Sequence, residues 1–263
     1  VYGDDPCTQF KIRGKAKERN AEIGLAMKMH KAIAVIQFKL DGQLIAEHPE
    51  YSMEDRRLLH RIDYEKGIIN IDGDEYPLLD RSFPTIDPDA PYSLTPDEVS
   101  VVKKLQSGFV HCEKPQRHIQ LLLKKGGLYK IYNGNLLYHG CVPMNEDGSF
   151  REVTVGGRKY KGRALYDVLE SNVRKAFISL SEKEKRTGRD TMWFLWNAPD
   201  SPLFGRSKMA NFERYFIADE RTHSEKKNPY YSFMDDTDTA VRILEEFGLT
   251  GENSHIINGH VPV

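Results

Sequence analysis

The sequence of 263 residues predicts an α/β protein with a mainly helical region in its first half. Two hydrophobic patterns lead to this prediction. Apolar side chains recur at helical spacing across residues 16–40, which indicates a long amphipathic helix. Farther along, short apolar runs such as residues 136–138 are bounded by turn residues, which is typical of buried strands in an α/β sheet.

The first predicted helix, residues 16–40, places six apolar side chains along one face, and charged residues are grouped at its start. These six are Ile23, Ala26, Met29, Ile33, Ile36 and Leu40. We assign His30 and the methionines of this segment to packing, because methionine readily fills cores. A second, short helix is predicted from Ser52, which precedes acidic residues and then basic ones, as in a capped helix.

A hairpin and a third helix follow. The pair Asp72-Gly73 between two extended segments is a strong hairpin signal. Four prolines then fall within residues 83–98, a density that excludes regular structure until the chain reaches Thr-Pro-Asp-Glu at 95–98. That motif combines a capping threonine, a proline at the first helical position and a glutamate three residues after the cap. It therefore predicts a helix starting at residue 96.

The pattern changes near residue 126. A possible helix at 116–125 ends at two glycines, and short strands, an acidic loop, a strand within 151–157 and a helix over 162–180 follow. We therefore expect residues 1–126 to form a mainly helical accessory region and residues 127–263 to form a part that contains the sheet.

Composition restricts the function. The 38 basic and 39 acidic residues leave a net charge of −1, so no global field favours nucleic acid. Three widely spaced cysteines favour a reducing compartment, with cytoplasm as the default, and no segment is apolar enough for a membrane span. The chain starts with Val1 and ends just after an apolar run, so we expect a piece of a longer polypeptide, and a homo-oligomer is left open.

Candidate site residues lie in the second half. His139 and His260 each end an apolar strand, and each is adjacent to a glycine that leaves room for a ligand near the backbone. Between them, a loop over residues 192–209 starts with two tryptophans as a packed anchor and carries Arg206 and Lys208. Neutral imidazole suits manganese, iron or zinc, and basic side chains suit phosphate. A core histidine bonded to backbone, and solvated surface cations, remain the alternatives.

These segments resemble a known family. The strings "YNGNLLYHGCVPMNEDG", "FLWNAPDSPLFGR", "FERYFIADERTHSEKKNPYY" and "INGHVPV" are similar to class III fructose-1,6-bisphosphatases, within the calcineurin-like metallophosphoesterases. The resemblance extends through essentially the whole chain, including the opening "VYGDDPC". It implies part of a four-layer α/β sandwich whose later strands and helices lie in residues 127–263, with residues 1–126 as a helical insertion.

The resemblance also implies a reaction and a metal centre. The reaction is hydrolysis of fructose 1,6-bisphosphate to fructose 6-phosphate, a gluconeogenic step, with Mn²⁺ in a dinuclear site. His139 and His260 match the family's strand-end and Gly-His metal ligands. The family's Asp-x-His, Gly-Asp-x-x-Asp and Gly-Asn-His-Asp segments, which supply the bridging aspartate and the general acid, do not occur in this sequence. We therefore expect no catalytic residue in this chain and no activity from the chain alone.

Two other functions remain open at this stage. A protein Ser/Thr phosphatase shares the His-Gly, Leu-Trp and Gly-His elements, although the acidic loop and long helical region fit it poorly. A non-catalytic binding or regulatory module is the alternative from a different class, and the missing ligand segments favour it.

Overall fold

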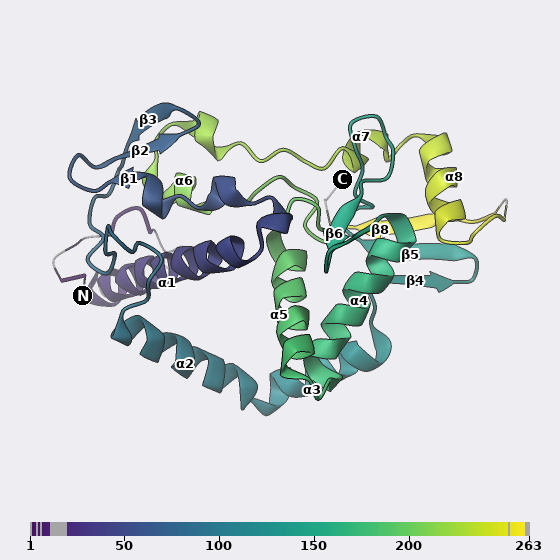
Figure 1. The fold of residues 1–263 in the computed structure, drawn as a ribbon, viewed down its shortest axis with the longest axis horizontal. Helices are drawn as coiled ribbons and strands as arrows, with labels where there is room; N and C mark the ends of the chain where they lie inside the picture. Colours follow the sequence, from purple (N-terminus) through teal and green to yellow (C-terminus); the bar gives the residue numbers. More distant parts are fainter. Residues whose placement is uncertain (1, 4, 6, 11–19, 252, 261–263) are drawn as a thin grey trace. The chain divides into compact units, whose positions relative to one another are not determined.

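The computed structural model describes residues 2–3, 5, 7–10, 20–251 and 253–260, which form a mixed α/β protein (Figure 1). The chain divides into two compact units. Unit 1 comprises Val1–Pro49, Met53–His111 and Ala210–Ser224, and unit 2 comprises Glu50–Ser52, Cys112–Met209 and Glu225–Val263. The boundary expected at residue 126 falls inside unit 2, because the helix preceding it packs on helices of that unit.

Unit 1 combines helices with a small antiparallel sheet of order β1-β2-β3. The predicted hairpin is confirmed: β2 and β3 pair antiparallel, and Asp72 and Gly73 form the turn with positive φ angles of 54° and 95°. The elements are α1 (Asn20–Glu47), η2 (Glu54–Arg56), η3 (Leu59–Arg61), β1 (Ile62–Asp63), β2 (Ile68–Ile71), β3 (Asp74–Pro77), α2 (Pro96–Val110), α6 (Asn211–Phe216) and η4 (Glu220–His223).

The long helix α1 is confirmed from Asn20 and continues past residue 40 to Glu47, whereas residues 16–19 lie outside the described residues. Its predicted apolar face was partly wrong. Met29 and Ile33 are 62% and 42% exposed, and the fully buried side chains include Lys31 and Lys39. Buried ion pairs help to decide which side of this helix is covered, and the spacing of apolar residues does not encode such pairs. The prediction from spacing therefore missed part of the buried face.

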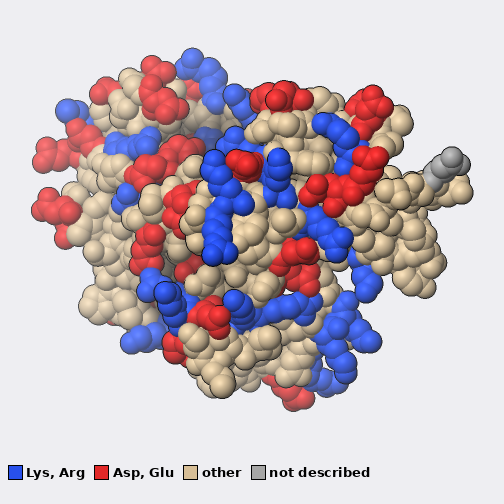
Figure 2. Space-filling model, turned by 45° about the vertical axis from the view of Figure 1, so that its right-hand side comes forward, with Lys and Arg blue, Asp and Glu red and all other residues tan. Residues whose placement is uncertain are grey.

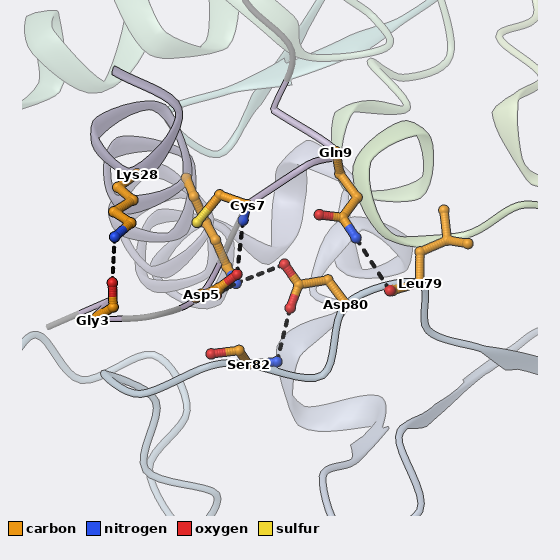
Figure 3. Close-up of polar contacts among 9 residues, drawn as sticks. Gly3, Asp5, Cys7, Gln9, Lys28, Leu79, Asp80 and Ser82 are labelled. Atoms are coloured by element: carbon orange, nitrogen blue, oxygen red, sulfur yellow. Dashed lines mark hydrogen bonds and ion pairs between the residues drawn. The ribbon is translucent and has the colours of Figure 1, made fainter. Parts of the chain in front are cut away.

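These buried lysines are paired with carboxylates. Lys31 contacts both Asp5 and Asp80, the second at 2.6 Å, and Lys39 lies 2.8 Å from Glu98. Figure 3 shows Asp5 and Asp80 directed toward the same place, with the Ser82 amide donating to Asp80 at 2.8 Å. Because a buried ammonium is costly unless it is paired, these contacts connect α1 to the segments around residues 5, 80 and 98.

The helix predicted from Ser52 is wrong. The segment forms only the 3-10 turns η2 and η3, and Ser52 has a φ of 54°, which is incompatible with the extended backbone of an N-cap. Met53, Leu58 and Leu59 are all buried, and the backbone breaks between the two turns so that these side chains all reach the core. Tertiary packing therefore overrode the local capping signal.

The third helix is confirmed as α2. Thr95 accepts from the Glu98 amide at 3.2 Å, and the Glu98 carboxylate accepts from the Thr95 amide at 2.8 Å, a complete capping box. Glu98 also pairs with Lys39, so one carboxylate both caps α2 and neutralises a buried lysine of α1.

Unit 2 holds a three-stranded sheet of order β4-β5-β8, with β4 and β5 antiparallel and β5 and β8 parallel, and a separate hairpin of β6 and β7. The sequence-predicted strands near 136–138 and 151–157 and the helix over 162–180 are confirmed. The elements are α3 (Glu113–Lys125), β4 (Tyr129–Tyr132), β5 (Asn135–His139), β6 (Val153–Val155), β7 (Arg158–Tyr160), α4 (Gly162–Ile178), α5 (Glu182–Asn197), α7 (Tyr230–Phe233), α8 (Thr237–Glu246) and β8 (Ile256–Gly259), with the 3-10 turn η1 (Pro49–Tyr51) at the sequence boundary of the units.

One face of the β4-β5-β8 sheet is buried against helices α4 and α8. On this face Leu136 and Tyr138 pack on Tyr166, Ile243 and Phe247. Because side chains alternate along a strand, Leu137 and His139 lie on the opposite face. No helix within the described ranges has both the length and the apolar character needed to cross a membrane.

Candidate functional site

The parallel pairing of β5 and β8 brings the two predicted histidines together. In the register of the ladder His139 lies opposite Gly259, so His260 follows at the same end of the sheet. The Nδ1 atom of His260 lies 3.0 Å from Nε2 of His139, and the two rings are nearly perpendicular, at 88°. Both side chains are exposed in this chain.

A hydrogen-bond network fixes the backbone around this pair. The Asn258 side-chain amide donates to the Gly140 carbonyl at 2.9 Å and to the Tyr230 hydroxyl at 2.7 Å. The Tyr230 hydroxyl also lies 2.7 Å from the hydroxyl of Tyr138, and the Gly140 amide donates to the Gly259 carbonyl at 3.0 Å. The two strand ends are thus joined both through backbone and through side chains.

Gly140 has a specific steric role beside His139. Its φ is 91°, and a Cβ atom placed on it would lie 2.0 Å from the Pro202 carbonyl oxygen. The next amide, of Cys141, donates to that same carbonyl at 2.7 Å. Only glycine allows this close approach, which holds the 202–206 segment against the histidine-bearing strand. Cys141 itself is fully buried.

The prediction that Trp193 and Trp196 form a packed anchor at the start of a loop is wrong. Residues 192–197 are the last turns of helix α5 and not a loop, and Trp196 is 67% exposed and therefore does not serve as a packed anchor. Trp193 stacks on Tyr51 with ring centroids 6.2 Å apart. The loop begins only after Asn197, because Ala198 adopts an extended backbone that ends the helix.

Arg206 is part of an isolated β-bridge. Its backbone forms an isolated antiparallel bridge with Lys227, and its guanidinium donates to Glu225 at 3.0 Å. Glu225 is 15% exposed, so this ion pair is partly shielded from water and holds the guanidinium in place. Lys208 is half-buried two residues farther along.

The surroundings of His260 lower its pKa. Partial burial is the largest cause, the neighbouring His139 and Arg206 add positive charge that acts in the same direction, and a backbone hydrogen bond with Phe204 opposes them. His260 is therefore neutral at neutral pH, which is the form of imidazole that binds metals. Arg206 is thereby placed within electrostatic reach of the histidine pair.

The facing nitrogens of the two imidazoles lie at hydrogen-bonding distance, 3.0 Å. An unprotonated ring nitrogen is also a ligand for first-row divalent metals, so these two side chains have the chemistry of metal ligands. Across the described part of the chain, no group of three or more His, Cys, Asp or Glu side chains is placed to hold a metal ion. The chain thus presents two imidazole donors at this position.

Sequence reasoning missed three residues that shape this site: Asn258, Tyr230 and Glu225. Asn258 lies inside the quoted "INGHVPV", and its place directly before Gly259 and His260 was the one available signal. Nothing local marks Tyr230 or Glu225, because their roles depend on long-range pairing.

The fold and these residues define an α/β protein in which a parallel strand pair ends in two imidazoles close to a fixed arginine. Comparison with known proteins supplies the family. The family model described as Firmicute fructose-1,6-bisphosphatase matches residues 1–263. The chain belongs to this family.

Relatives agree with that assignment. The chain is 53% identical to "Fructose-1,6-bisphosphatase class 3" of Clostridium acetobutylicum over 265 residues, 50% identical to the protein of that name from Alkaliphilus metalliredigens over 267, and 48% identical to that from Listeria monocytogenes over 266. Each match includes the whole of this chain but only 40%, 40% and 41% of the relative. The chain therefore spans about 40% of the length of the curated relatives it matches. No solved structure matches the chain.

Proposed function

We propose that the complete protein to which this chain belongs hydrolyses fructose 1,6-bisphosphate to fructose 6-phosphate and phosphate, as a cytoplasmic enzyme of gluconeogenesis. The relatives that carry this name match the chain over its whole length. The observation that carries the proposal within the chain is the pair of imidazole nitrogens 3.0 Å apart at the ends of two parallel strands. Open α/β sheets place their chemistry at such strand ends.

In this proposal His139 and His260 are ligands of one cation in a dinuclear Mn²⁺ centre. When bound, the two cations lower the pKa of a water molecule and offset negative charge on the transferring phosphoryl group. Asn258 and Tyr230 hold the strand ends, so that both imidazoles keep their orientation. Arg206, fixed by Glu225, binds an oxygen of the reacting phosphate, and Lys208 adds positive charge.

The proposal includes a larger fold. The β4-β5-β8 sheet is the later part of a four-layer metallophosphoesterase sandwich, whose remaining strands lie outside this chain. The parallel pair β5 and β8 supports this idea, because parallel strands are generally covered on both faces. The bridging aspartate, the other metal ligands and the general acid would come from that remaining part.

The test is a phosphatase assay on the complete protein with Mn²⁺. We expect release of phosphate from fructose 1,6-bisphosphate, loss of activity after chelation, and restoration on adding Mn²⁺. A phosphopeptide assayed in parallel should be hydrolysed far more slowly. Preference for the phosphopeptide would indicate a protein phosphatase, and no hydrolysis of either substrate would indicate a binding module.

A further inference from the structure

The backbone of a neighbouring segment holds Arg206 in place. The bridge between Arg206 and Lys227 is continued on one side by a hydrogen bond of 2.9 Å from the Asn228 amide to the Gly205 carbonyl. On the other side, the Ser207 amide donates at 2.7 Å to the carbonyl of residue 226. The position of Arg206 therefore depends on where residues 226–228 lie.

The side chain of Asn228 joins this segment to two others. Its Oδ1 atom accepts from the Met144 amide at 3.2 Å and from the Tyr230 amide at 3.0 Å. The bond from Tyr230 is the local kind that asparagine makes with the backbone two residues on. Met144, in contrast, lies 84 positions away, in the segment that continues from β5 after His139. One amide oxygen thus links the Arg206 segment to the chain that follows His139.

The residues in these contacts are covered within unit 2. Asn228, Met144 and Tyr230 are 8%, 2% and 3% exposed. The contacts are therefore complete without the part of the relatives that this chain does not span. Because a buried amide that loses its acceptor is destabilising, removal of this oxygen should rearrange the segments that it joins.

Tyr230 continues the connection to the histidines. Its hydroxyl lies 2.7 Å from the Tyr138 hydroxyl and accepts from the Asn258 side-chain amide at 2.7 Å. Tyr138 directly precedes His139, and Asn258 lies two positions before His260. A displacement of Tyr230 would therefore act on the strand ends that carry both imidazoles.

Charge over the surface is mixed, which makes the placement of single cations important. On the face shown in Figure 2, Lys and Arg side chains lie among Asp and Glu side chains, as expected for a net charge of −1. A phosphate group would therefore be selected by fixed local groups and not by a global field. How firmly Arg206 is held then matters for binding and for alignment of the phosphate.

We propose that Asn228 is a positioning residue that holds Arg206 and the histidine pair in one fixed arrangement. This inference rests on the proposed function, in which Arg206 binds the reacting phosphate and the two histidines bind Mn²⁺. Asn228 acts through the Gly205 carbonyl and the Tyr230 amide, and not through contact with the substrate. Small misplacements of groups that align a substrate cause large losses of rate, so a residue behind both groups affects both.

The first experiment compares two substitutions of Asn228 in the complete protein. Asn228→Ala removes the acceptor, and we expect it to weaken Mn²⁺ binding in isothermal titration by about tenfold or more. At saturating Mn²⁺, its kcat/KM for fructose 1,6-bisphosphate should fall by about 100-fold. Asn228→Asp keeps oxygens that can accept from both amides, so it should restore most of both properties. Asn253→Ala, on the exposed turn before β8, is the control and should change neither.

The second experiment is a double-mutant cycle that separates positioning from a general loss of structure. If Asn228 acts on the phosphate through Arg206, its effect on kcat/KM should disappear once Arg206 has been removed. We therefore expect Asn228→Ala, added to Arg206→Ala, to lower kcat/KM at saturating Mn²⁺ by less than about threefold further. If Asn228→Ala does not fold, Asn228→Ser takes its place in both experiments, because its shorter side chain keeps only the local bond from Tyr230.

The outcomes are distinct. Parent Mn²⁺ affinity and parent kcat/KM in the alanine variant would overturn this inference and leave the proposed function intact. Independent losses from Asn228→Ala and Arg206→Ala, or no recovery in Asn228→Asp, would mean that Asn228 serves only the stability of the fold, and would also overturn it. If the parent enzyme does not hydrolyse the bisphosphate at all, the proposed function fails, and this inference with it.

Discussion

Nδ1 of His260 lies 3.0 Å from Nε2 of His139, although the two residues are 121 positions apart in the chain. Two backbone features produce this contact. The parallel register sets His139 opposite Gly259, and His260 has a φ of 124°, an uncommon value for a residue with a side chain. Such a backbone persists only where the surrounding structure over-determines it.

The first prediction concerns metal binding. In the complete protein, His139→Ala or His260→Ala should weaken Mn²⁺ binding by about 100-fold or more, because losing a ligand is at least as damaging as losing its supporting partner. Phosphatase activity should fall to background in both variants. Isothermal titration measures the binding independently of activity. His118→Ala, which removes an exposed histidine of α3, is the control, and full Mn²⁺ affinity in the His260→Ala protein would disprove the ligand assignment.

The second prediction concerns the 263-residue chain by itself. With added Mn²⁺ it should not hydrolyse fructose 1,6-bisphosphate, because two imidazoles cannot supply both a dinuclear centre and a general acid. A malachite green assay for released phosphate, with the complete protein as positive control, measures this. Sustained turnover by the isolated chain would contradict the prediction.

The third prediction compares two glycines with positive φ. Gly140→Ala should destabilise unit 2 by about 3 kcal/mol or more, since strained backbone is joined by a clash with the Pro202 carbonyl. Gly134→Ala, in the β4-β5 turn, has a φ of 71° but no atom within 4 Å of the added carbon, so it should cost only about 1–2 kcal/mol. Urea unfolding of the two variants measures the difference. Equal losses of stability in the two variants would mean that the Pro202 carbonyl can move away from the added carbon.

The fourth prediction is a pH dependence. Burial acts to raise the pKa of Glu98, but the hydrogen bonds from Lys39 and the Thr95 amide outweigh it, and the net effect is a pKa below the ordinary 4.5. Since the folded-state pKa is the lower one, this carboxylate stabilises the fold above pH 4.5, and that stabilisation is lost as the pH falls through the folded-state value.

Glu98→Gln should therefore reduce stability at pH 7 and flatten the loss of stability on acidification below pH 4.5. Thermal unfolding at a series of pH values measures both effects. Glu65→Gln, an exposed glutamate of the same unit, should leave the profile unchanged. A Glu98→Gln profile parallel to that of the parent protein would argue against the assigned role of the Lys39 pair.

The fifth prediction tests the network behind the histidines. Asn258→Asp replaces the donating amide with acceptors only, so the bond to the Gly140 carbonyl is lost, while the Tyr230 hydroxyl can still donate to the new carboxylate. Mn²⁺ affinity of the complete protein should fall by about 10- to 100-fold, because the supporting partners of ligands are nearly as important as the ligands. Asn253→Asp, on the exposed turn before β8, makes the same chemical change as a control. Equal metal affinity in the two variants would show that the network supports only the fold.

Local signals were sufficient for several elements. The capping box at residues 95–98, the Asp72-Gly73 turn and the 162–178 helix are each encoded within a few neighbouring residues, whose side chains act on their own backbone. The two histidines were also identifiable, since each follows a short apolar strand beside a glycine. Family membership follows from the same sequence, because long strings of matching residues specify it.

Tertiary structure decided what depends on residues far apart in the chain. The buried face of α1 follows from ion pairs of Lys31 and Lys39 with carboxylates 26 to 59 positions away, which hydrophobic spacing does not register. The 52–61 segment lost its expected helix because buried side chains required a different backbone. Likewise, the register of β5 on β8 determined that His139 and His260 meet, because a parallel ladder joins strands that no local signal connects.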